Sequence, residues 1–294
     1  MTSILAKFDL TGRTAVVTGG AGLLGKEFCR TLAEAGAAVV VADLNEDAAT
    51  GTAESLQQEG FRARGIKTDV TDPPSVKRMV DSTLETFGRL DILVNSAALD
   101  PKVDPQALAT LATPVFGRSL TAFTDPLGSF EDYPLDAWNT ALNVNLTGMF
   151  LITQACVGPM LAQGKRSGVL KGSIINICST YGLNGPDQRI YRKVGRPETF
   201  KPVYYSVTKA GVLGFTKYLA AYYMGTQIRV NALTPGGVYN QHDDTFVANY
   251  SAKTILGRMA DKDEMNGGLL FLASDASSYM TGANLVVDGG WTAW

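Results

Sequence analysis

Histidine is scarce in this sequence of 294 residues, and cysteine is little more frequent. The single histidine, His242, removes most catalytic schemes that pair a serine or cysteine with a histidine base, so we expect it to be a loop residue. The three cysteines, Cys29, Cys156 and Cys178, lie in apolar surroundings without the spacing of metal ligands. They predict reduced core thiols, with neither a disulfide framework nor a bound metal.

Long apolar runs and an excess of charge are also missing. No stretch of eighteen or more apolar residues occurs, so we expect no membrane span. A formal charge of −2 gives no overall basic field, which argues against nucleic acid as a partner. Because the amino terminus also has no basic leader before an apolar stretch, the sequence predicts a cytoplasmic protein.

What the sequence does contain is a regular alternation of short apolar strands with helical segments. With 45% hydrophobic residues the chain can bury one large core. Such alternation predicts a parallel sheet covered by helices on both faces. The expected fold class is α/β, a doubly wound (Rossmann) sheet of about seven strands in a single domain, residues 1–294. Strands are expected at 13–18, 38–42, 61–68, 91–95, 172–179, 229–236 and 284–288, and later helices at 46–58, 72–87, 135–161, 203–224 and 261–273.

A glycine-rich turn, Gly19 to Gly25, follows the first expected strand. Glycine lets the backbone approach a pyrophosphate closely, and the following helix offers unpaired N–H groups at its amino terminus. The second strand ends at Asp43, where a carboxylate would bind both hydroxyls of an adenosine ribose and repel a 2′-phosphate. We therefore expect NAD rather than NADP; a helix cap before Glu46 is the plain alternative for Asp43. Asp69, after the third strand, could hold the adenine amino group.

The pair Tyr205 and Lys209 sets a phenol and an ammonium one helical turn apart. A secondary alcohol oxidised by a nicotinamide must lose a proton as its hydride leaves, and Tyr205 is the candidate to accept it. Because tyrosine titrates near about pH 10, this role needs a pKa lower by about three units, which a cation in a partly dry cleft favours. An ordinary surface pair is the alternative, since the spacing alone is common.

Two further polar residues are expected near the same chemistry. Ser179 would end the strand 172–179, where its hydroxyl can bind the oxygen that Tyr205 protonates. Without a histidine base it is not expected to be a nucleophile, and a turn-capping hydroxyl is its alternative role. Asn145 lies in the long helical stretch, where a buried asparagine should bind backbone or water.

These motifs occur in one order: Thr18-Gly-x-x-Gly-x-x-Gly25, Asn95-Ser-Ala-Ala98, Asn145, Ser179, Tyr205-x-x-x-Lys209 and Pro235-Gly236. On these residues the chain resembles the short-chain dehydrogenase/reductase family along nearly its whole length. The resemblance implies a catalytic set of Asn145, Ser179, Tyr205 and Lys209. In it, Lys209 also grips the nicotinamide ribose, and Asn145 supports a water chain that relays the proton to solvent. The Asn-Leu-x-Gly context selects Asn145 over its rival Asn143.

The cofactor contacts that we expect combine the turn and strand-end positions with those implied by the resemblance. They are Gly19, Gly22, Leu23, Leu24, Gly25, Asp43, Asp69, Val70, Asn95, Ala97, Tyr205, Lys209, Pro235, Gly236 and Val238. Two positions depart from the usual family pattern. Leu23 occupies the middle glycine position of the turn, a spacing more like that of the family's extended members, and Asn95-Ser-Ala-Ala98 replaces Asn-Asn-Ala-Gly.

The chain is also longer than compact relatives usually are, which predicts insertions near 99–130 and 183–202 that flank the cleft, with a lid near 237–258. Within the second insertion the local charge is +3, from Arg189, Arg192, Lys193, Arg196 and Lys201 against Asp187 and Glu198. This favours an anionic substrate, although a solvated loop or pairing with an acidic neighbour such as Glu131-Asp132 is the alternative. Substrate contacts are expected at Ser179, Arg189, Arg192, Tyr205 and Asn240.

The sequence therefore predicts an NAD-dependent oxidoreductase that interconverts a secondary alcohol and a ketone. A polar anionic sugar or sugar acid is the expected substrate, since the chain loosely resembles acidic-sugar and gluconate oxidoreductases. The alternatives are a reductase of 3-oxoacyl or other hydrophobic ketones, and a catalytically silent NAD-binding sensor or scaffold. Intact Ser179, Tyr205 and Lys209 argue against the silent protein.

The final segment carries two large apolar rings, Trp291 and Trp294. They predict either a subunit interface or a chain end folded back on the cleft. Relatives commonly pack the helix that bears Tyr205 and the preceding long helix against copies, so the resemblance implies a homo-oligomer, a tetramer or a dimer.

Overall fold

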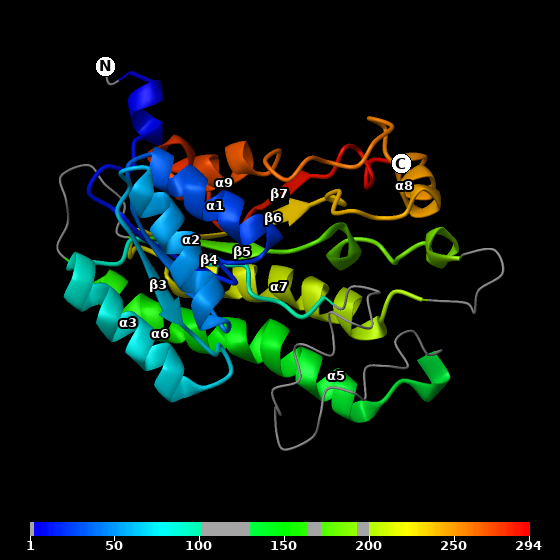
Figure 1. Cartoon of the computed structure of the whole chain (residues 1–294), viewed down its shortest axis with the longest axis horizontal. Coiled ribbons are helices and arrows are strands. Elements are labelled where there is room, and N and C mark those ends of the chain that lie inside the picture. Colours follow the sequence, from blue (N-terminus) through cyan, green and yellow to red (C-terminus); the bar gives the residue numbers. More distant parts are fainter. Residues whose placement is uncertain (1–2, 101–129, 164–171, 193–199) are drawn as a thin grey trace.

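The structure, a computed structural model, describes residues 3–100, 130–163, 172–192 and 200–294 (Figure 1). Seven parallel strands within these ranges form one sheet in the order β3-β2-β1-β4-β5-β6-β7. The order changes direction between β1 and β4, the switch point of a doubly wound fold, so the expected α/β class is confirmed. The strands are β1 (Thr14–Thr18), β2 (Ala38–Asp43), β3 (Ala63–Lys67), β4 (Ile92–Asn95), β5 (Gly172–Ile177), β6 (Ile228–Pro235) and β7 (Asn284–Val287).

Helices cover both faces of this sheet (Figure 1). Apolar side chains of α1, α2 and α9 pack on one face, and those of α3, α6 and α7 on the other. Along β1, Ala15 and Val17 belong to the first core and Val16 to the second, because side chains alternate between the faces of a strand. These helices are α1 (Leu23–Glu34), α2 (Glu46–Gln58), α3 (Pro73–Phe87), α6 (Met149–Ala162), α7 (Val203–Tyr222) and α9 (Asn266–Ala273).

The remaining helices lie in the connections. The expected long helix is confirmed as a continuous rod, but its middle is a π-helical segment, η4 (Asn143–Gly148), between α5 (Leu135–Leu142) and α6. The predicted lid stretch contains α8 (Asp244–Ser251). The short 3₁₀ helices are η1 (Leu5–Phe8), η3 (Phe130–Asp132), η5 (Thr180–Gly182), η6 (Gln188–Tyr191) and η7 (Asp275–Ser277).

Most boundaries differ from expectation by no more than one or two residues, and one helix begins five residues later than expected. The helix expected from Asp261 begins at Asn266, because the Glu264 carboxylate accepts the Asp261 N–H and pairs with Arg258, which forms a turn instead. The strand expected to reach Ser179 ends at Ile177. Most of the first expected insertion, 101–129, and residues 193–199 of the second lie outside the described residues, so Lys193, Arg196 and Glu198 are not placed.

The rod Leu135–Ala162 is, in the part of the chain that the structure describes, the one helix long and apolar enough to cross a membrane. It contacts α3 and α7 within the fold, and 44% of its most apolar window is buried. A core helix passes the same test of length and composition, so this finding is weak evidence for a membrane span.

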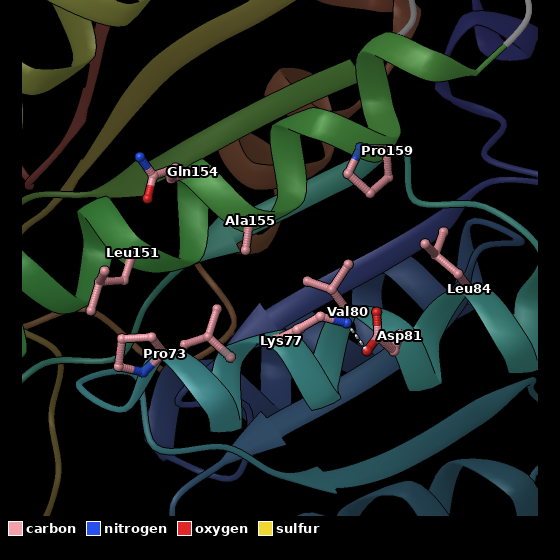
Figure 2. A pocket seen from close by; sticks show the side chains of 10 residues that line it. Pro73, Lys77, Val80, Asp81, Leu84, Leu151, Gln154, Ala155 and Pro159 are labelled. Carbon is pink, nitrogen blue, oxygen red and sulfur yellow. Dashed lines mark hydrogen bonds and ion pairs between the residues drawn. The ribbon is translucent and has the colours of Figure 1, made fainter.

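A groove of about 340 Å³ lies between α3 and α6 (Figure 2). Val80 and Leu84 of α3 and Leu151 of α6 contribute apolar walls, and the ion-paired Lys77 and Asp81 also line it. None of its lining residues is a site residue predicted from the sequence. The predicted chemistry lies instead at the carboxyl edge of the sheet, where ligands bind in doubly wound folds.

A chain of buried polar side chains joins β4, β5 and α7. The Asn95 amide Nδ2 donates to Asn176 Oδ1 at 2.8 Å, and Asn176 Nδ2 donates to Thr216 Oγ1 at 2.9 Å. Thr216 in turn donates to the backbone oxygen of Val212 at 2.8 Å. Because Asn176 is fully buried, its bonds fix how α7 sits on the two strands that lead to the site.

Replacing Asn176 with alanine should lower the free energy of unfolding by about 2–4 kcal/mol, because buried donors and acceptors lose their partners. Urea denaturation followed by circular dichroism measures this. Asn139→Ala, at an exposed position on α5, is the matched control and should change stability little. Equal stability of the two variants would contradict a structural role for the polar chain.

Candidate active site

The glycine turn after β1 brings three backbone segments into close contact. Gly19 adopts a φ of +63°, and a Cβ there would lie 2.9 Å from Cα of Ala97. A Cβ on Gly25 would lie 2.0 Å from the carbonyl oxygen of Gly19. Side chains at these positions would fill the turn, so glycine is required for the backbone approach that a pyrophosphate needs.

The helix that follows the turn begins at Leu23, with Gly22 as its N-cap residue, and among the described residues no side chain caps it. Its first N–H groups, including those of Leu23 and Leu24, therefore form a site suited to phosphate oxygens. Leu23, which replaces the middle glycine of the motif, is 38% exposed and takes no part in the buried core. The residues present thus fit a dinucleotide.

Asp43 ends β2 beside this turn, as expected. Its Oδ2 accepts the Ala21 N–H at 3.1 Å and its Oδ1 accepts the Asn45 N–H at 3.1 Å. The N-cap of α2 is Asn45, whose side chain accepts the Ala48 N–H. Asp43 therefore does not cap this helix, which was the alternative role considered for it. The carboxylate is held at the strand end and remains partly exposed.

The residues at the carboxyl ends of β3 and β4 differ in which side chains are available to a cofactor. Asp69 Oδ1 accepts both the N–H and the hydroxyl of Thr71, which fixes the turn, and Val70 packs on Gly148, where a Cβ would lie 2.6 Å from Val70 Cγ2. The Asn95 side chain points into the polar chain of the core, with 2% of its surface exposed. Any cofactor contact of Asn95 is therefore restricted to its backbone.

Tyr205 and Lys209 lie on α7, and Ser179 follows β5 by two residues. The Ser179 and Tyr205 hydroxyls share a hydrogen bond. Lys209 has only 6% of its surface exposed, and its Nζ lies 5.8 Å from the centroid of the Tyr205 ring. The structure therefore brings the three residues together, and the surface-pair alternative does not apply.

The electrostatics of this pair are dominated by burial. Burial raises the pKa of Tyr205, and the charge of Asp100 raises it further, whereas the hydrogen bond from Ser179 lowers it. Burial also lowers the pKa of Lys209, whose ammonium donates to the carbonyl oxygen of Ile177 at 2.9 Å. Nearby positive charge is thus what the phenol needs in order to ionise near neutral pH.

Asn145 lies in the π-helical segment and is 98% buried, with 2% of its surface exposed. Its Oδ1 accepts the Leu99 N–H at 2.6 Å, and its Nδ2 donates to the Leu99 carbonyl and to Thr208 Oγ1, both at 3.2 Å. It therefore links the loop after β4 to the residue next to Lys209. Its rival Asn143 is only partly buried.

The far side of the cleft is formed where β6 ends, at Pro235. A Cβ on Gly236 would lie 2.7 Å from Cα of Asp288, and the Gly237 N–H donates to the hydroxyl of Tyr250 at 2.5 Å. Val238 forms a parallel bridge with Ala260. Tyr250 thus ties α8 of the predicted lid directly to the backbone expected to face the nicotinamide.

An aromatic wall continues from Tyr250. The Trp291 ring stacks on Tyr250 with centroids 4.2 Å apart and contacts Tyr181 edge to face at 6.3 Å. Tyr181 in turn contacts Tyr205 edge to face at 6.3 Å. Trp291 is therefore buried against its own chain, as the fold-back alternative predicted, whereas Trp294 is 75% exposed.

The residues expected to contact substrate are less closely gathered. The Arg189 guanidinium makes two hydrogen bonds of 2.7 Å to Asp187, and these hold the pKa of that carboxyl well below its usual range. Lys253 also pairs with Asp187. Arg192 is exposed, and the Asn240 N–H donates to His242 Nδ1. Arg189 is thus engaged by Asp187, a carboxylate already counted in the net charge of +3.

The described residues include no group of three or more histidine, cysteine or acidic side chains placed to hold a metal ion. What they assemble is a glycine-rich turn at a helix amino terminus, a carboxylate at the end of β2 and a tyrosine, serine and lysine at one edge of the sheet. These features together define the site of a nicotinamide-dependent alcohol oxidoreductase.

A family model described as short chain dehydrogenase matches residues 13–251, and the chain belongs to this family. It is 33% identical to a cis-4-hydroxycyclohexanecarboxylate dehydrogenase of Sinomonas cyclohexanicum, covering 96% of this chain and 97% of that one. It is 35% identical to a 3-alpha-(or 20-beta)-hydroxysteroid dehydrogenase of Mycobacterium bovis, covering 97% and 91%. A solved gluconate 5-dehydrogenase of Burkholderia cenocepacia J2315, in complex with NADP and tartrate, has a TM-score of 0.79 at 31% identity, covering 99% and 100%.

Gly25→Ala should weaken NADH binding at least about tenfold, because its Cβ would lie 2.0 Å from a backbone oxygen and the turn would have to open. Titration of NADH fluorescence measures the affinity. The control is Gly51→Ala on α2, where no atom lies within 4 Å of the added Cβ. If Gly25→Ala folds as judged by circular dichroism and binds NADH normally, the dinucleotide does not lie at this turn.

Proposed function

We propose that this protein is an NAD-dependent oxidoreductase that interconverts a secondary alcohol and a ketone at Tyr205. The observation that carries the proposal is the contact of the Tyr205 phenol with Ser179 on one side and the proximity of the buried Lys209 ammonium on the other. A phenol with a donor beside it and a cation in a dry environment is suited to proton transfer. Belonging to the short-chain dehydrogenase family supports the reaction class.

In this mechanism the Ser179 hydroxyl holds the substrate oxygen, and Tyr205 accepts the proton of the alcohol or returns it to the ketone. A nicotinamide, when bound, exchanges the hydride. Lys209 favours the ionised phenol and, held by the Ile177 carbonyl, is fixed in direction. Asn145, bonded to Thr208 beside this pair, would support the water that passes the proton on.

The preference for NAD rests on Asp43. Its carboxylate lies at the end of β2, already bonded to the turn by the Ala21 N–H, and a 2′-phosphate there would meet a fixed negative charge. The gluconate 5-dehydrogenase of Burkholderia cenocepacia was solved with NADP, so the proposed preference for NAD needs a direct test.

For the substrate we propose a polar anionic secondary alcohol of the sugar-acid type. The basic and polar residues of segment 185–202 support this. The structural relative that is named for gluconate and was solved with tartrate supports it as well. The aromatic wall favours a second candidate, a carbocyclic alcohol that bears a carboxylate, because flat rings bind apolar ring faces. A relative named for 4-hydroxycyclohexanecarboxylate fits that chemistry, and one named for hydroxysteroids fits the hydrophobic-ketone alternative.

We further propose a homo-oligomer, a dimer or tetramer, that works in the cytoplasm with a lid over 237–258. Large apolar side chains are exposed along α6 and α7, including Phe150, Val207, Tyr218 and Tyr222, and these would be covered by a copy. The three cysteines are free and buried, which suits a reducing compartment. The hydrogen bond from the Gly237 N–H to the Tyr250 hydroxyl joins α8 to the backbone expected to face the nicotinamide, which supports a lid in contact with the cofactor site.

Tyr205→Phe should lower kcat/KM by at least about 100-fold, because the phenylalanine ring cannot carry a proton. The test follows NADH absorbance with gluconate and related sugar acids, 4-hydroxycyclohexanecarboxylate and a hydroxysteroid. Tyr279→Phe, at a fully exposed position, is the matched control and should act as the wild type does. Absence of NAD-linked turnover in wild type and variant alike would favour the silent sensor instead.

Asp43→Ala should shift the ratio of kcat/KM for NAD to that for NADP toward NADP by at least about tenfold, since the charge that repels a 2′-phosphate is removed. Because Asp43 also holds the turn, both values can fall, and the ratio is the quantity that decides. The control is Asp47→Ala, an exposed acidic position on α2. A wild type that already prefers NADP would overturn the role given to Asp43.

A further inference from the structure

A second lysine lies against the catalytic tyrosine. Lys201 precedes Tyr205 by four residues, just before α7 begins, and its Nζ lies 3.9 Å from the centroid of the Tyr205 ring. Lys209 follows Tyr205 by four residues and lies 5.8 Å from the same point. Two ammonium groups therefore flank one phenol, and the nearer one is not the one that the sequence motif contains.

Two hydrogen bonds and one ion pair hold Lys201 in this place. Gln188 of η6 binds its backbone on both sides, accepting the Lys201 N–H at 2.7 Å and donating to the Lys201 carbonyl at 3.3 Å. Its ammonium pairs with Asp100 at 2.5 Å, and the side chain is only 14% exposed. A solvated surface lysine would have none of these restraints, so the position over the ring is a built feature.

The charged and titratable groups that face Tyr205 come from every neighbouring element. They are Asp100 after β4, Cys178 after β5, Tyr181 of η5, Tyr191 of η6, Lys201, and Tyr204 and Lys209 on α7. Among them the two lysines carry positive charge and Asp100 carries negative charge. The charge of a phenolate spreads into its ring, so a cation over the ring face favours ionisation and an anion nearby opposes it.

We propose that Lys201 is a positioning residue that sets the protonation of Tyr205, with its ammonium stabilising the phenolate and Asp100 both holding that ammonium in place and moderating its effect. The proposal deepens the proposed function, since it rests on Tyr205 as the group that carries the proton. The protonation of Tyr205 would then depend on the ion pair of Lys201 and Asp100, both of which lie outside the Tyr-x-x-x-Lys motif.

The two partners must act with opposite sign. Removing the Lys201 charge should raise the pKa of Tyr205, because burial and Asp100 then act with one cation fewer against them. Removing the Asp100 charge should lower the pKa, because its raising effect is lost while Lys201 remains. A unit charge at this distance, at an effective dielectric near about 20, corresponds to a shift of about one pH unit or more.

The experiment needs no substrate. Protein labelled with ¹³C at Cζ of tyrosine is titrated by NMR, with the Tyr205 resonance identified by its loss in Tyr205→Phe. Lys201→Met and Asp100→Asn are compared with the wild type. The matched control is Lys77→Met, which breaks another lysine–aspartate pair, with Asp81 at 2.6 Å on α3, among the residues that line the groove in Figure 2.

The expected result is a Tyr205 pKa about one unit or more higher in Lys201→Met, lower in Asp100→Asn and unchanged in Lys77→Met. Lys201→Arg keeps the charge over the ring and should restore the wild-type titration. Titration of Lys201→Met like that of Lys77→Met, or shifts of the same sign in both partners, would overturn the proposal.

A purely structural role of Lys201 would disturb the fold without this opposite pair of shifts. If Lys201→Met does not fold, Lys201→Gln removes the same charge with a polar side chain and should likewise raise the pKa of Tyr205. The result is also separate from the proposed function. If the protein shows the opposite pKa shifts but no NAD-linked turnover, the role of Lys201 and Asp100 stands and the proposed enzymatic function fails. If the protein is active but shows no such shifts, the enzymatic function stands and the role of Lys201 and Asp100 fails.

Discussion

The candidate active site depends on keeping a lysine ammonium charged at a buried position. Lys209 is nearly fully buried, burial lowers its pKa, and its bond to the Ile177 carbonyl compensates only part of its lost hydration. A phenolate one helical turn away is the natural counterion for such a cation. Two other side chains at this edge of the sheet also act on the phenol: the hydroxyl of Ser179 lowers the pKa of Tyr205, and the carboxylate of Asp100 raises it.

Several loops at this edge are held by one side chain bonded to another segment's backbone. Asn145 binds both backbone groups of Leu99, and Gln188 does the same for Lys201. Asp43 and Tyr250 each accept an N–H from a glycine-rich turn or its neighbour. An amide or carboxylate that takes up backbone groups satisfies them and fixes the loop at once, so these loops are positioned without regular secondary structure of their own. This leaves the connections between those anchors free to vary in length.

The sequence predicted the features that depend on local spacing and missed those that depend on distant parts of the chain. Tyr205 and Lys209 share a helix turn, and Asp43 follows directly from β2, so their places could be inferred from neighbours. Lys201 and Asp100 are 101 residues apart, and only the fold brings them together. The inward direction of the Asn95 side chain likewise follows from packing across β4, β5 and α6, which no short motif records.

The π-helical segment at 143–148 has a consequence for how this site could be lost. A π-turn carries one residue more than its α-helical equivalent, and here it interrupts an otherwise regular rod. Deleting a single residue there would let the rod relax into an uninterrupted α-helix, while rotating Asn145 away from Leu99 and Thr208. Such a deletion would thus make the helix regular and break the contacts by which Asn145 links the loop after β4 to α7.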